Sequence, residues 1–158
     1  MTQEEMQEVL NNVMLCITEK MTGVQLKCEE NICINDCCTV NVVFEGNCDV
    51  KLSLCADKLF FIRITKSILQ DDNITEQDMQ DTAKEYLNVI CGNLIGKLFN
   101  ATYKLTRFKF PIFKDGNHII DNSENVQHIC QTCYYNDYNE NVMLVITMSL
   151  NCIDKENI

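Results

Sequence analysis

The sequence is poor in residues that interrupt regular structure and has no long apolar run. Its 158 residues include one proline, five glycines and no tryptophan. No segment reaches the 18 or more consecutive apolar residues of a transmembrane helix, so we expect no membrane span. Residues 1–5 are acidic and lack the basic and apolar regions of a signal peptide, which predicts a cytoplasmic location.

Positive charge is also scarce. There are 13 Lys and Arg residues against 23 Asp and Glu residues, for a net charge of −10. Binding to nucleic-acid phosphates, or to an anionic membrane surface, requires clustered basic residues. The composition therefore argues against both partners and leaves another protein or a small molecule.

The pattern of apolar residues predicts an α+β fold in a single domain, residues 1–158. Helical spacing indicates one helix over residues 4–20, ended by Gly23, and a long helix over residues 76–99. Thr75 and Asp78 resemble a capping box for the long helix. Alternation predicts strands at residues 24–30, 39–44, 50–55, 59–65, 103–113, 127–135 and 142–151, with a hairpin link at residues 45–47.

The order helix, strands, helix, strands suggests a duplicated α-β-β-β unit. The two pseudo-repeats would span residues 1–70 and 71–158. The simplest packing places two long helices on one antiparallel sheet.

Eleven cysteines could suggest a disulfide framework, but their number is odd and no export signal precedes them. We interpret most of them as buried or inactive thiols of a reducing compartment. Two alternatives stay open. One is metal binding by Cys28, Cys33, Cys37 and Cys38, and the other is a redox role for the CxxC pair Cys130 and Cys133.

Familiar catalytic patterns are missing: there is no glycine-rich phosphate loop, no G-x-S-x-G and no H-E-x-x-H. His118 and His128 are interpreted as structural or exposed residues.

The long helix carries a polar stripe. Asp81, Glu85, Asn88 and Gly92 share one face. The opposite face carries an apolar set, which is Leu87, Ile90, Leu94 and Leu98. Such a stripe is typical of a solvated helix face, but an exposed mid-helix glycine costs about 1 kcal/mol relative to alanine. Gly92 therefore suggests that another group approaches the helix there.

The spacing Asp81-x3-Glu85-x2-Asn88-x22-Pro111 resembles the signature of the CheC/CheX/FliY chemotaxis phosphatases at all four positions. The resemblance implies that family's fold and its phosphatase action on a phosphorylated CheY-like response regulator. Asn88 would orient the attacking water, and Glu85 would pair with a lysine of the regulator. Asp81, Gly92 and Pro111 would belong to the partner-binding surface. The chain would bind no cofactor, because the regulator supplies the Mg²⁺.

The first helix repeats part of this signature. Glu4, Glu8 and Asn11 precede Asp81, Glu85 and Asn88 by 77 positions each. Leu15 and Ile34, however, stand where Gly92 and Pro111 stand in the second copy. We therefore expect a degenerate first site, which favours the single-site CheX type and, by resemblance, a homodimer.

Two other functions compete with this hypothesis. A docking or switch module of the same fold would bind regulators without hydrolysing their phosphate, and a cysteine-based metal or redox protein would use the thiols.

Overall fold

The computed structural model describes residues 2–45, 50–98, 107–119 and 126–149. This part of the chain forms three helices and seven strands. The helices are α1 (Gln3–Thr22), α2 (Lys58–Leu69) and α3 (Glu76–Leu98). The strands are β1 (Lys27–Glu29), β2 (Cys37–Glu45), β3 (Val50–Asp57), β4 (Arg107–Phe108), β5 (Ile112–Asp115), β6 (Val126–Tyr135) and β7 (Asn141–Ser149).

The strands form one antiparallel sheet in the order β1-β6-β7-β3-β2-β4, and β5 also pairs with β2. Strands from the two ends of the chain are interleaved. β1 pairs with β6, while β4 and β5 pair with β2. β3 and β7 meet at the centre, with Ser53 opposite Val145.

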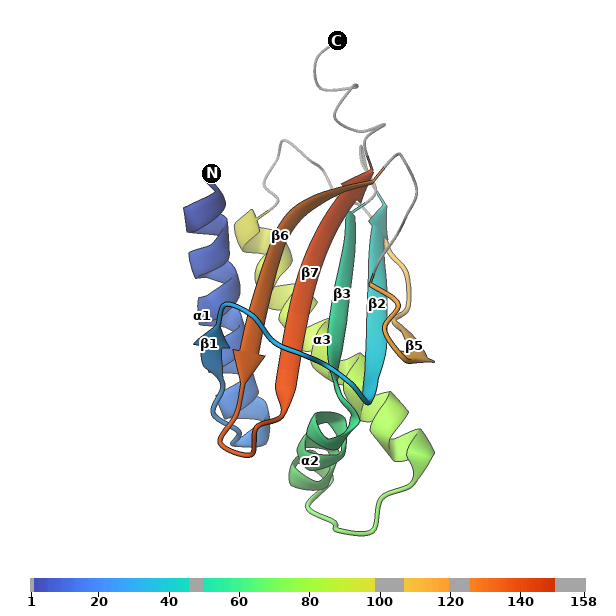
Figure 1. Ribbon diagram of the computed structural model, residues 1–158. Helices are drawn as coiled ribbons and strands as arrows, with labels where there is room; N and C mark the ends of the chain where they lie inside the picture. Colours follow the sequence, from blue (N-terminus) through green and yellow to red (C-terminus); the bar gives the residue numbers. More distant parts are fainter. Residues whose placement is uncertain (1, 46–49, 99–106, 120–125, 150–158) are drawn as a thin grey trace.

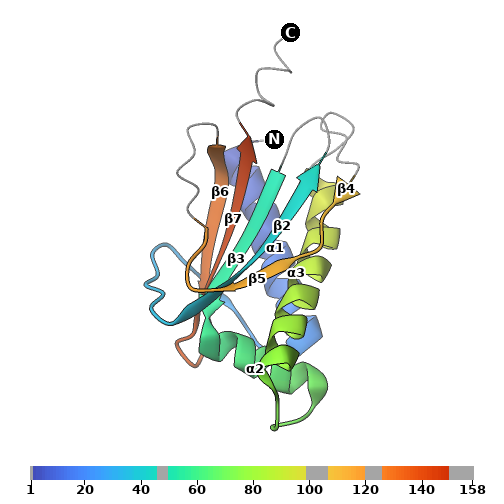
Figure 2. The same ribbon diagram turned by 90° about the vertical axis from the view of Figure 1, so that its right-hand side faces the viewer.

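The two long helices, α1 and α3, lie side by side on one face of this sheet, and α2 packs near one end of it (Figures 1 and 2). The α+β class predicted from the sequence is thus confirmed, with one helix more than expected. The duplication boundaries stay a prediction.

Local signals fix both ends of α1 and the start of α3. Thr2 and Glu5 form a capping box at the start of α1, and Gly23 ends that helix at φ 74°, a conformation suited to glycine. At α3 the amide of Asp78 donates to Thr75 Oγ1 at 3.0 Å, and the amide of Thr75 donates to Asp78 Oδ2 at 2.9 Å. The capping box predicted at Thr75 is therefore confirmed.

The strand predicted at residues 59–65 is wrong, because this segment belongs to α2. Its β-branched and aromatic residues favour a strand by propensity. The buried side chains, however, follow helical spacing: Phe60, Phe61, Ile64 and Thr65. Packing of this stripe against β3 and α3 outweighs the local preference.

Other boundaries differ by a few residues. The strand expected at residues 24–30 shortens to β1, and that expected at 103–113 is represented by β4 and β5. The hairpin link expected at residues 45–47 lies largely outside the described residues, as do Phe99 and residues 150–151.

The main core lies between the sheet and the helices. Val40, Leu54 and Leu144 on neighbouring strands and Leu87 and Ile90 on α3 are fully buried in it. A smaller apolar cluster lies on the other face of the sheet and comprises Cys37, Cys55, Ile119 and Val145. The link between β1 and β2 crosses this second face and packs Ile34 on the cluster (Figure 1).

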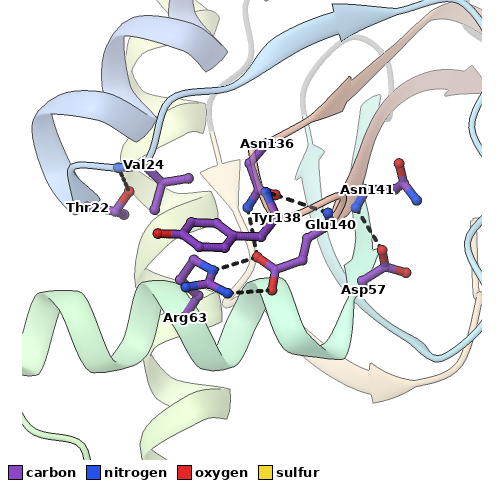
Figure 3. A network of polar contacts seen from close by, with 8 residues as sticks. All are labelled: Thr22, Val24, Asp57, Arg63, Asn136, Tyr138, Glu140 and Asn141. Atoms are coloured by element: carbon purple, nitrogen blue, oxygen red, sulfur yellow. Dashed lines mark hydrogen bonds and ion pairs between the residues drawn. The ribbon is translucent and has the colours of Figure 1, made fainter.

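An ion pair between the buried Glu140 and the partly exposed Arg63 holds α2 against the β6–β7 turn (Figure 3). Arg63 donates from Nε to Glu140 Oε1 at 2.7 Å and from Nη2 to Oε2 at 3.1 Å. Glu140 is 5% exposed and also accepts from Asn136 Nδ2. The Arg63 guanidinium also stacks on the Tyr138 ring, 3.4 Å from its centroid. One cation thus pairs with a buried carboxylate and contacts an aromatic ring.

Arg63→Ala should lower the free energy of unfolding by about 3 kcal/mol, because it leaves a buried carboxylate without its counter-charge. The matched control is Lys27→Ala, whose ion pair with Asp137 has a similar N–O distance of 2.8 Å but is exposed. That change should cost markedly less, because solvent screens an exposed ion pair. Chemical denaturation of both variants measures the difference. Equal losses would mean that burial adds nothing to the Arg63 pair.

Candidate active site

Helix α3 carries the predicted site, and contacts with the core hold this helix in place. Its apolar stripe is buried as expected: Leu87, Ile90, Leu94 and Leu98. The Tyr86 side chain is fully buried, and its hydroxyl hydrogen-bonds to Thr18 Oγ1 of α1 at 2.5 Å. These contacts fix the rotation of α3 about its axis, so its polar stripe faces away from the core.

Along that stripe Asp81 and Glu85 are exposed, while Asn88 is half-buried. Asp81 accepts a hydrogen bond from Gln77 Nε2 at 2.8 Å. Glu85 and Asn88 lie one helical turn apart on the same face, so both side chains can reach one partner.

The amide oxygen of Asn88 is unusual. It is buried, and it accepts no hydrogen bond from any described residue. An unpaired buried acceptor costs about 1–3 kcal/mol, and such atoms are rare in folded proteins. The described part of the chain therefore leaves this amide oxygen without a partner.

Gly92, the next residue on the stripe, is exposed, and a β-carbon built on it meets no atom within 4 Å. Its backbone is helical, so neither space nor conformation inside the chain requires glycine at this position. Gly96, one turn further, is equally open.

Pro111 lies in a bulge beside α3. Phe44 pairs with Phe108 and Asn41 pairs with Ile112, so two residues of β2 face three residues between β4 and β5. Pro111 is buried in this bulge, where its missing N–H costs no ladder hydrogen bond. Since β5 packs against α3, Pro111 joins the same part of the molecule as the α3 stripe.

The corresponding residues of the first helix are arranged differently. Glu8 is exposed, but Asn11 Oδ1 accepts a hydrogen bond from the Tyr134 hydroxyl at 2.8 Å. Burial raises the pKa of Tyr134, so the hydroxyl stays protonated and can donate. Leu15 packs on the main core, and Ile34 lies on the opposite face of the sheet. Leu15 and Ile34 thus do not reproduce around Asn11 the arrangement that Gly92 and Pro111 have in the second copy, although Asn11 lines a cleft of about 580 Å³.

Tyr134 is the residue that sequence reasoning missed. Strand alternation places it on the same face of β6 as Thr132, but no local signal shows that its hydroxyl reaches a helix 123 positions away.

Cysteine chemistry finds little support in the described residues. Among them no three His, Cys, Asp or Glu side chains gather as a metal site, so the proposed ligands Cys28, Cys33, Cys37 and Cys38 are not brought together. Cys130 and Cys133 lie three positions apart on a strand, so they point to opposite faces.

Burial also raises the pKa of several thiols above the ordinary value, which disfavours the reactive thiolate. The pKa of Cys91 rises to about 12 for this reason, and those of Cys130 and Cys133 rise as well. His118 is exposed, and its Nε2 lies 2.6 Å from the carbonyl oxygen of Asp115, so it has a local partner as expected. The His128 side chain lies outside the described residues.

Three clefts, of about 580, 340 and 250 Å³, lie elsewhere on the described surface. None of the three is lined by Glu85, Asn88 or Gly92. The candidate site thus lies outside these three clefts, on a face of α3 where Asp81, Glu85 and Gly92 are exposed and Asn88 is half-buried. Among the described residues no helix is both long and apolar enough to cross a membrane.

Comparison with known proteins gives a consistent result. CheX from Desulfovibrio desulfuricans superposes with a TM-score of 0.71 at 18% identity, over 92% of this chain and 99% of that chain. CheX from Vibrio vulnificus gives 0.73 at 14% identity with the same coverage. A complex of CheX, CheY, beryllofluoride and Mg²⁺ from Borrelia burgdorferi gives 0.68 at 12% identity, over 90% of this chain and 96% of that chain.

At these identities the structural likeness establishes the fold alone. No curated protein matches the chain significantly. The family described as chemotaxis phosphatase CheX, however, matches residues 38–134, which is more than half of the sequence. The chain therefore belongs to the CheX family.

Proposed function

We propose that this protein hydrolyses the aspartyl phosphate of a CheY-like response regulator, using Glu85 and Asn88 of α3. The observation that carries the proposal is the contrast between two asparagines in matching motifs. Asn11 has its amide oxygen occupied by Tyr134, whereas the amide oxygen of Asn88 accepts no hydrogen bond from the described residues. Membership of the CheX family supports the same assignment.

Asn88 acts on the attacking water. A side-chain amide both donates and accepts hydrogen bonds, so it can fix the orientation of a water molecule. The water oxygen attacks phosphorus, the bond between phosphorus and the acyl oxygen breaks, and the regulator's aspartate leaves as a carboxylate. Inorganic phosphate carries the added oxygen. Phosphoryl transfer depends mainly on positioning and charge stabilisation, so no strong base on this chain is required.

Glu85 acts on the regulator itself. Its exposed carboxylate lies one turn before Asn88 and would pair with a lysine of the regulator as the two proteins dock. The pair would hold α3 at the depth where Asn88 meets the water.

The Mg²⁺ belongs to the regulator in this proposal. Mg²⁺ is usually held by one or two carboxylates together with substrate phosphate oxygens, and in this proposal the phosphate lies on the regulator. The Borrelia burgdorferi complex contains CheX, CheY and Mg²⁺ together, which fits a metal brought by the partner.

The remaining motif residues shape the surface. Asp81 and Gly92 are exposed and can contact the partner directly, whereas Pro111 is buried and would act by fixing the bulge beside α3. The homodimer and the cytoplasmic location stay predictions from the sequence. The competing hypothesis is a docking module of the same fold without hydrolysis.

Asn88→Ala should reduce kcat by about 10²–10³-fold, since one group positioned in the transition state commonly contributes that much. Binding of the beryllofluoride form of the regulator should be nearly unchanged. Glu85→Ala should weaken binding as well as turnover, and its binding effect should shrink with added salt. Phosphate release and titration calorimetry separate the two variants.

Thermal unfolding is the control for both changes. Neither should lower the melting temperature, because Glu85 is exposed and the Asn88 amide oxygen accepts no hydrogen bond from the described residues. A folded Asn88→Ala protein with full turnover would contradict the mechanism and favour the docking module.

Asn11→Ala should retain nearly full turnover, because the Tyr134 hydroxyl already engages that amide. The same phosphate-release assay tests this expectation. A loss as large as that of Asn88→Ala would mean two working sites per chain.

Gly92→Ala and Gly96→Ala should each raise the free energy of unfolding by about 1 kcal/mol, because both sites are open and helical. Gly92→Ala alone should raise KM for the phosphorylated regulator, since Gly96 lies about 6 Å further along the helix. Denaturation and steady-state kinetics measure the two effects. An unchanged KM for Gly92→Ala would show that no partner approaches closely there.

A further inference from the structure

Two large apolar side chains are exposed in the chain segment around Pro111. Phe110, in the bulge between β4 and β5, is 91% exposed, and Ile112, at the start of β5, is 56% exposed. Scattered apolar residues on a surface need no explanation. These two, however, flank a buried residue of the family motif and lie on the segment that packs beside α3 (Figure 2).

The segment is held in place, so the exposure does not come from a loose loop. Before Phe110, the amide of Lys109 donates to the carbonyl oxygen of Val43 at 2.9 Å. After it, Pro111 is buried and Phe113 packs inward, with its ring centroid 6.3 Å from that of Phe61. Ile112 pairs with Asn41 and Phe113 with Val40 of the main core, so strand alternation turns Ile112 to the face of the sheet away from the helices.

β5 also lies at an edge. Among the described residues its only partner strand is β2, so no described strand pairs with its other side. Edge strands with exposed apolar side chains invite association with another chain.

The polar face of α3 is too small to bind a folded partner alone. A stable interface buries about 800 Å² on each side, and its binding energy concentrates in aromatic and other large side chains. Glu85, Asn88 and Gly92 offer charge, an amide and bare backbone. The contact must therefore continue onto neighbouring surface, and the β5 edge is adjacent.

We propose that Phe110, supported by Ile112, is the apolar anchor of the docking surface for the phosphorylated response regulator. This inference rests on the proposed function and names the residues that give it affinity. It requires that the regulator present an apolar depression beside its phosphoaspartate cleft. A second copy of this chain seated on the same edge would crowd the α3 face, so the predicted homodimer should use another part of the sheet.

The test uses the full chain and a panel of CheY-like regulators in their beryllofluoride–Mg²⁺ forms for binding, with their acetyl-phosphate-charged forms for turnover. Phe110→Ser should raise both Kd and KM by about 10–50-fold and leave kcat within twofold, because the anchor contributes equally to ground state and transition state. Ile112→Ser should have a smaller effect in the same direction. Phe110→Leu, which keeps an apolar contact, should recover part of the loss.

Leu59→Ser is the matched control, since Leu59 is 64% exposed on α2. It should leave Kd and KM within twofold. Melting temperatures should not fall in any of these variants, because the replaced side chains are exposed.

Several results would overturn the inference. These are equal Kd values for Phe110→Ser and Leu59→Ser, a fall in kcat in place of a rise in KM, or no binding to any regulator of the panel. A further result would also overturn it: Phe110→Ser changes the oligomeric state in sedimentation experiments while Kd per chain stays constant. The β5 edge would then join copies of this chain. If the unmodified protein binds a regulator through Phe110 but releases no phosphate, the docking surface stands and the proposed hydrolysis fails.

Discussion

The pairing of β3 with β7 is the constraint on which the rest of the structure depends. These strands come from opposite halves of the chain and lie side by side at the centre of the sheet. Neither half of the sequence forms a contiguous sheet by itself, because β1 is separated from β2 and β3 by strands of the second half. The platform under α3, including the β5 bulge that holds Pro111, therefore exists only when both halves are in place. The position of the site therefore depends on contacts between residues that are distant in sequence.

The two asparagines show how one side-chain contact can separate similar sequence motifs. Asn11 and Asn88 occupy matching positions, yet Tyr134 satisfies the first amide and no described residue satisfies the oxygen of the second. An unsatisfied buried acceptor lowers stability, and proteins tolerate such costs where function requires them. Under the proposed function, α1 has become a structural helix and α3 retains the reactive face.

Much of this architecture could be read from local patterns. The apolar stripe of α3, the capping box at Thr75 and the end of α1 at Gly23 depend on neighbouring residues, and all were predicted. Residues 59–65 were misassigned because strand propensity competes there with a helical stripe whose burial is decided by tertiary packing. The motif residues were found by spacing. Neither the Tyr134 contact with Asn11 nor the exposure of Phe110 has a local signal, since both follow from strand pairing.

The position of Glu85 and Asn88 outside the three clefts bears on which phosphorylated compounds this protein can hydrolyse. Neither residue lines one of the three clefts described above, so none of these three clefts encloses a small acyl phosphate beside Asn88. Under the proposed function, a small compound such as acetyl phosphate would contact the Asn88 amide only transiently. It would lack the metal and the fixed geometry that a docked regulator supplies. This protein would then not hydrolyse a cellular pool of small acyl phosphates. Selectivity for the substrate would depend on the shape of the partner protein, and the chain would hydrolyse phosphate only when that partner is bound.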